Sequence, residues 1–588
     1  MPSYLRHLNS LTSVALLGLA SLAVAHGDDE PDMNMDMTAG SNSTVPVFDG
    51  EDMNNYFRYT QHGGLMATHI ALMTIAWVFI LPICVMFSIS RSRFTLLTQF
   101  AFLAINAAGV LCSTIYNAST PDLYPNNAHH KIGWLLTWIC CAQVVIGVIS
   151  AYAGHRDNKQ KDSGYTPVSR EAMAEHTRRL QQNDSRLSND SGQGTEPNTE
   201  SLRSGSISVD GDEDIALDEP EKDDSEVEKI ALMKGTKIDK YLARRLPGLI
   251  SARILRVFEF AYNVVDRLIL LLGFVALTTG IITYGGLFVS ITHKHHPTTL
   301  LTPIQKGDRV FSGLAHFIKG SVFFWYGILT LGRWAGCFAE LGWSWNIKPT
   351  ESRRFSPSAE FVESFLIFFY GATNVFLEHL AAWGSEWSAQ DLEHLSITFM
   401  FIGGGLCGMF IESTQIRTLL NTGVQNSSPE TTFHPEAKEP KTYRFSLNPI
   451  PALVIMLLGM MMSSHHQHSM VSTMIHKQWG SLLVGAAFAR AATYVLVYLA
   501  PPTSILPGRP PTELVTAFAL MAGGEVFMAS AVDVVRSIEV NGLDAMFVFT
   551  VSMGLITFLM AWVILAIAIK GWAVRRERRW GKGFVGGV

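Results

Sequence analysis

Blocks of apolar residues recur along this chain, and no other feature restricts its possible folds so strongly. A helix needs roughly 20 apolar residues to cross the roughly 30 Å hydrocarbon core of a bilayer. Only 16% of the residues are charged, against roughly 25% in soluble domains. We therefore expect an all-α, polytopic transmembrane bundle surrounded by lipid. Its eleven predicted spans are 65–89, 94–117, 132–152, 260–281, 310–331, 361–382, 392–411, 452–464, 480–499, 514–534 and 545–569.

The first 25 residues have the pattern of a secretory signal peptide. Arg6 and His7 precede a short apolar run, which ends at the small residues Ala23-Val24-Ala25. Cleavage there would leave a mature chain beginning at His26, with residues 26–61 as a lumenal or extracellular tail. The alternative is an uncleaved anchor helix. In either case the chain enters the secretory or endomembrane system, and no retrieval signal identifies the compartment.

Basic residues predict the orientation of the spans, because Lys and Arg accumulate in short cytosolic loops. Clusters follow the first, fifth and last predicted spans, at Arg91 and Arg93, at 333–354, and at 570–579. A lumenal N-terminus places all three in the cytosol, together with the basic tail 575–588. The sequons at Asn42 and Asn117 are then lumenal and are predicted glycosylation sites.

Residues 155–249 separate two membrane blocks, at 62–154 and 250–574. This stretch is rich in Ser, Asp and Glu and has too few apolar residues to offset the entropy of ordering. It is predicted to be a disordered cytosolic linker. The sequence contains no phosphate-binding loop, HExxH motif or basic nucleic-acid-binding stripe, and its six cysteines indicate no disulfide framework. We therefore expect no nucleic-acid partner.

The first block carries two histidine motifs, His69-x-x-Leu72-Met73 and His130-x-x-Gly133. They occur with Pro82, Gln143 and Gly147, and in this set they resemble the cytochrome b561 family. That resemblance implies that His69 and His130 are the axial ligands of one b-type haem. The family's second histidine pair falls here on Thr95 and Tyr262, so the resemblance implies at most one haem.

The whole chain resembles the fungal YTP-like family, in which a short membrane block is joined by a polar linker to a longer one. The resemblance rests on both blocks, including Gly307-Asp-Arg309, the segment from Glu378-His379 to Glu393-His394, and the stretch 463–468. It implies a multi-pass membrane protein but little about mechanism.

Most of the 19 histidines fall on the predicted lumenal side. Imidazoles suit zinc, copper or iron and titrate near pH 6.5. A lumenal metal or proton site is therefore predicted where three helix ends meet, with His-rich interfacial loops as the alternative. The alternating Met33, Met35 and Met37 could add a site for Cu(I), or be a plain polar tail. The predicted ligands are His379, His394, His465, His466 and His468.

Three ionisable residues fall near the centres of predicted spans, namely Lys319, Arg490 and Glu525. Such groups are costly in hydrocarbon, so they pair with one another or line a polar path. Arg490 and Glu525 are expected to form an ion pair. Three functions stay open: a haem- or metal-dependent redox protein acting at the lumenal face, a metal-ion or proton-linked transporter, and a membrane scaffold without catalysis.

Overall fold

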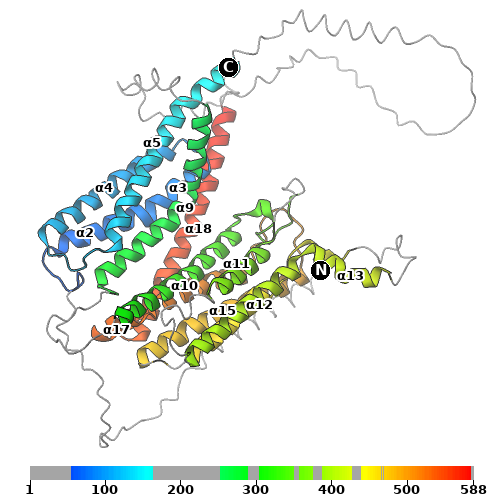
Figure 1. Cartoon of the computed structure of the whole chain (residues 1–588). Helices are drawn as coiled ribbons and strands as arrows, with labels where there is room; N and C mark the ends of the chain where they lie inside the picture. Colours follow the sequence, from blue (N-terminus) through cyan, green and yellow to red (C-terminus); the bar gives the residue numbers. More distant parts are fainter. Residues whose placement is uncertain are drawn as a thin grey trace, which may run out of the picture. The chain divides into compact units, whose positions relative to one another are not determined.

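The computed structural model describes residues 55–162, 252–288, 303–349, 357–374, 387, 389–426, 439–464, 467 and 469–583. Within these residues the chain is helical and contains no strand (Figure 1). Nine of the described helical segments are long and apolar enough to cross a membrane. They are Gly63–Ile89, Thr95–Ser119, Ala128–Ser150, Ile254–Gly285, Gly313–Ala335, Leu392–Glu412, Met470–Leu499, Pro511–Ala529 and Ala545–Arg579.

Each of these nine segments matches one of the predicted spans. The first consists of α2 (Gly63–Thr74), a π-helical stretch (Ile75–Ile80) and α3 (Leu81–Ile89). The others lie in α4 (Thr95–Ser119), α5 (Ala128–Asp162), α9 (Ala252–Gly285), α10 (Pro303–Ala335), α12 (Ala389–Glu412), α15 (Met470–Leu499), α16 (Pro511–Ala529) and α18 (Ala545–Gly583).

The two remaining predicted spans correspond to shorter described helices. Helix α11 (Ala359–Asn374) is described for 16 residues, and the rest of span 361–382 lies outside the described residues. Helix α14 (Ile450–Ser463) has 14 residues and ends within the predicted span 452–464. The described part of the chain therefore supports a polytopic bundle without fixing the total at eleven.

Several helices begin or end at residues other than the boundaries of the predicted spans. Helix α15 begins ten residues before the predicted span at 480, because the Ser469 side chain caps it by accepting a hydrogen bond from Ser472 N. Span 514–534 divides instead into α16 and a separate helix, α17 (Val532–Val540). Helix α5 continues to Asp162, into the predicted linker, and the rest of that linker lies outside the described residues.

The chain forms two compact units, and the larger contains most of the C-terminal half. This first unit combines Val110–Gly133 and Phe274–Gly571 with the described residues up to Ile70. Within it α16 packs against both α10 and α15, α14 packs against α15, and α11 packs against α12. The second unit combines Ala71–Gly109, Trp572–Gly583 and the described residues between Trp134 and Gly273.

Glycines allow α10 and α16 to approach closely. A Cβ atom added at Gly320 would lie 2.6 Å from the backbone oxygen of Gly524, and one added at Gly327 would lie 2.7 Å from Met521 N. Without side chains at these points the two backbones pack in direct contact, as small residues permit in membrane helices. This close approach brings α10, which carries Arg333, against α16, which carries Glu513.

Candidate functional site: a buried charge network

Arg333 lies in the last turn of α10 and is 2% exposed. All of its guanidinium nitrogens are used. Nη1 is 2.8 Å from Glu363 Oε1, Nη2 is 2.9 Å from Glu360 Oε1, and Nε donates to Trp343 O at 2.8 Å. Arg333 had been predicted as part of a basic cytosolic flank. The fold instead buries it, because two glutamates of α11 compensate its charge.

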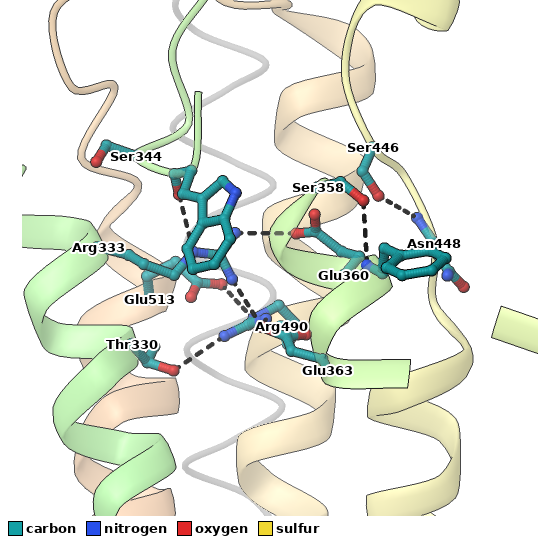
Figure 2. Close-up of polar contacts among 12 residues, drawn as sticks. Thr330, Arg333, Ser344, Ser358, Glu360, Glu363, Ser446, Asn448, Arg490 and Glu513 are labelled. Carbon is teal, nitrogen blue, oxygen red and sulfur yellow. Dashed lines mark hydrogen bonds and ion pairs between the residues drawn. The ribbon is translucent and has the colours of Figure 1, made fainter. Parts of the chain in front are cut away.

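Arg490 joins the same network from α15 and is also 2% exposed. Its Nε is 2.9 Å from Glu513 Oε1 and its Nη1 is 3.5 Å from Glu363 Oε1, while Nη2 donates to Thr330 Oγ1 at 3.2 Å. Figure 2 shows the two guanidinium groups converging on carboxylates from α11 and α16. Glu363 therefore bridges both arginines.

The charges suit their positions along the helices. Glu360 lies in the first turn of α11 and Glu513 in the first turn of α16, where partial positive charge stabilises carboxylates. Arg333 lies at the opposite pole of its own helix, where a cation is favoured. The helix dipoles therefore support the charges that the ion pairs compensate.

Two connecting segments close over this network. Trp345 lies with its ring centroid 4.7 Å from the guanidinium carbon of Arg333 and 5.5 Å from that of Arg490. The segment that follows α10 and contains Trp345 is joined to the segment that precedes α16, because Gly508 N donates to Ser344 O at 3.1 Å. Burial in the same segment raises the pKa of the Cys337 thiol. These contacts exclude water and strengthen the electrostatic interactions inside.

The network contains more negative than positive groups. Arg333 and Arg490 provide two charges, whereas Glu360, Glu363 and Glu513 provide three when ionised. Glu513 is fully buried, and its Oε2 has no hydrogen-bond partner among the described residues. A buried carboxylate without a compensating charge is costly in a membrane bundle.

The structure revises the predicted intramembrane pair. Arg490 pairs with Glu513 and Glu363, so its predicted pair with Glu525 is wrong. Glu525 lies twelve residues beyond Glu513 on α16, about 18 Å further along the helix axis at 1.5 Å per residue. Lys319 lies half-buried on α10.

The predicted histidine cluster falls largely outside the described residues. His379, His465, His466 and His468 are not described, and His394 lies half-buried in α12. Among the described residues no group of three or more His, Cys, Asp or Glu is placed to hold a metal ion. The metal site therefore stays a prediction. Asn42 is likewise outside the described residues, while Asn117 lies exposed in the last turn of α4.

His69 is placed opposite His129 and not opposite the predicted partner His130. The ring centroids of His69 and His129 are 6.3 Å apart, and His129 Nδ1 is 3.1 Å from Ala276 O. His130 is exposed. Successive residues of a helix point about 100° apart, so only one of two adjacent histidines can face α2. The residues implied by the b561 resemblance thus do not form the facing pair in this structure.

The positions of the second b561 histidine pair are occupied by other polar contacts. Tyr262 accepts hydrogen bonds from Gln99 Nε2 at 2.8 Å and from Ser88 Oγ at 3.3 Å. A cavity of about 10 Å³ lies beside them, lined in part by Gln99, Gln143 and the 2% exposed Asp266. That volume is enough for about one water molecule. A second haem at Thr95 and Tyr262 is not expected here.

Sequence reasoning missed most of the charge network. Glu360 and Glu513 follow Ser and Pro residues at the starts of apolar segments, where an acidic residue is typical of an exposed helix N-terminus. One feature of the sequence did indicate the network: Arg490 lies well inside an apolar span, where a charged side chain needs a partner on another helix. Choosing among the glutamates required the relative rotation of the helices.

The apolar helices and their buried charges define a multi-pass α-helical membrane protein. A family model described as YTP1-like protein, C-terminal, matches residues 272–571, and a domain of unknown function, DUF2427, matches residues 50–153. The chain belongs to the YTP1-like family of membrane proteins. The matched C-terminal region contains the entire charge network. No solved structure matches the chain.

The similarity to one relative covers nearly the whole chain. The uncharacterized membrane protein C3B8.06 of Schizosaccharomyces pombe is 34% identical over 538 residues, covering 89% of this chain and 97% of the relative. The uncharacterized membrane protein YCR061W of Saccharomyces cerevisiae is 42% identical over 47% of this chain and 45% of its own. Protein YTP1 of the same yeast is 27% identical over 29% of this chain and 28% of its own.

Proposed function

We propose that this protein is a proton-linked membrane transporter whose coupling site is the buried charge network of the C-terminal block. The observation that carries the proposal is the imbalance of two guanidinium groups against three carboxylates among the described residues. Two of these carboxylates, Glu363 and Glu513, have an Oε2 atom without a hydrogen-bond partner there. Ionisable groups inside membrane bundles commonly mark ion or proton paths.

Arg490 is the residue through which a proton would act on the fold. When Glu513 is ionised, Arg490 is shared between Glu513 and Glu363. Protonation of Glu513 removes one of these attractions and leaves a balanced set of two cations and two anions. The guanidinium then keeps Glu363, Thr330 and the Tyr326 hydroxyl as polar partners, beside the rings of Tyr326 and Trp345. Because Glu513 begins α16, this change bears on the helix that packs against both α10 and α15.

Proton flux into proteoliposomes tests the proposal. The purified chain would be reconstituted with a pH-sensitive dye inside, and a membrane potential negative inside would be imposed with potassium and valinomycin. We expect acidification with the native protein and its loss in Glu513→Gln, while the exposed control Glu539→Gln retains it. Absence of flux in a correctly folded native protein would leave the network a packing device, as in a membrane scaffold.

Haem binding is a second proposal, favoured by the approach of His69 to His129. A b-type haem bound between α2 and α5 would supply one-electron chemistry, and these two imidazoles would be its ligands. An absorption spectrum of the purified protein tests it, because a Soret band should disappear in His69→Ala and in His129→Ala but persist in His130→Ala. Metal analysis of the same sample tests the proposed Zn or Cu site at His379, His394, His465, His466 and His468.

A further inference from the structure

Helix α13 (Thr414–Asn426) has one apolar face and one polar face. Ile416, Leu419 and Leu420 recur at the three- and four-residue spacing of an amphipathic helix. At 100° per residue these side chains occupy one side of the helix, and Thr418 and Thr422 occupy the other. A helix of this pattern requires an apolar environment for its stripe.

The protein does not supply that environment within the described residues. Leu419 is 69% exposed and Leu420 is 75% exposed. The other short amphipathic helix, α17, behaves in the opposite way, because its apolar Val535 and Ile538 are buried in the core. We therefore expect the exposed leucines of α13 to contact an apolar surface outside the described part of the protein.

The polar edge of α13 is fixed by contacts with the segment that precedes α14. Asn421 Nδ2 donates to Tyr443 Oη at 3.3 Å, and the guanidinium carbon of Arg417 lies 4.8 Å from the Tyr443 ring centroid. These contacts set the rotation of the helix about its axis. The leucines therefore project away from the Tyr443 contact.

The position of α13 along the chain indicates that the surface it contacts is that of the bilayer. Helix α12, which is apolar enough to span the membrane, ends at Glu412, and α13 begins two residues later at Thr414. A connection this short keeps the start of α13 at the boundary of the bilayer. From residue 412 to residue 449 the sequence carries four basic and four acidic residues, so it has no net charge: Arg417, Lys438, Lys441 and Arg444 against Glu412, Glu430, Glu436 and Glu439. The apolar stripe, and not charge, is therefore the feature that suits α13 to the interface between headgroups and acyl chains.

We propose that α13 is a lipid-binding element that lies in the plane of the membrane surface. Leu419 and Leu420 insert at the boundary between headgroups and acyl chains. The element anchors the end of α12 to one leaflet. This inference does not depend on the proposed transport function.

Site-specific fluorescence in nanodiscs tests the proposal on the full chain. An environment-sensitive fluorescent amino acid would replace Leu420 in one variant and Thr418 in a matched control on the opposite face. Lipids carrying a nitroxide just below the headgroup would serve as quenchers in phosphatidylcholine discs. We expect several-fold stronger quenching at 420 than at 418.

The other outcomes contradict the proposal. Equal quenching at the two positions would show that α13 does not present its apolar face to lipid. Weaker quenching at 420 than at 418 would show that the opposite face of the helix meets the lipid. Because both labelled residues are exposed, size-exclusion profiles matching the native protein provide the folding control.

Discussion

Arg490 and Glu513 form a buried ion pair, with 2.9 Å between Nε and Oε1, although they belong to different helices. Both side chains are at most 3% exposed. Glu363 approaches the same guanidinium from a third helix at 3.5 Å, so Arg490 is the point where α11, α15 and α16 are electrostatically joined.

Removal of an arginine and removal of a glutamate should therefore differ sharply in their effects on stability. Arg490→Gln leaves three carboxylates with one guanidinium, and we expect it to lower the free energy of unfolding by about 3–5 kcal/mol. Glu513→Gln leaves two of each and should cost clearly less. Thermal unfolding of the purified proteins in one detergent compares them. Equal losses would contradict the charge count.

Alanine at the contact between α10 and α16 should force the helices apart. A Cβ at Gly320 would lie 2.6 Å from Gly524 O, and backbone cannot yield as a flexible side chain does. We expect Gly320→Ala to cost about 1–3 kcal/mol, typical of overpacking. Gly554→Ala is the matched control, because nothing lies within 4 Å of its added Cβ. A neutral Gly320→Ala would mean that these backbones are not in contact.

A buried hydrogen-bond pair holds α4 within the N-terminal block. Asn106 is 1% exposed, accepts from Trp77 Nε1 at 3.0 Å and donates to Thr137 Oγ1 at 3.2 Å. Asn106→Leu strands the indole N–H, so we expect a loss of about 1–3 kcal/mol by thermal unfolding. The double variant Trp77→Phe with Asn106→Leu removes both partners and should recover part of that loss. No recovery would show that the indole hydrogen bond is not the cause.

Glycosylation tests the predicted orientation. We expect a glycan on Asn42 and none on Asn117, because Asn117 lies within the last turn of a helix long enough to span the membrane. Endoglycosidase treatment should shift the mobility of the native chain but not that of Asn42→Gln. Glycan on Asn183 or Asn189 would place the predicted linker in the lumen and reverse the orientation.

The membrane architecture could be predicted from sequence because the length of an apolar run is a local property. Nine predicted spans recur as described helices, and the deviations arise at caps such as Ser469. The charge network was harder to predict from sequence, because the choice of ion-pair partners depends on how each helix is rotated about its axis. Nothing local distinguishes His129 from His130, or selects Glu513 over Glu525 as the partner of Arg490.

The order in which the charges occur along the chain has a consequence for biogenesis. Arg333 is synthesised first, and Glu360 and Glu363 follow within thirty residues. Arg490 then brings the network to two positive and two negative groups, so these four groups are balanced before α16 is made. Glu513 arrives last and adds a charge that no later member of the network offsets. Because a carboxylate without a partner is costly in a membrane, we expect α16 to insert stably only when Arg490 of α15 is already in place to pair with Glu513.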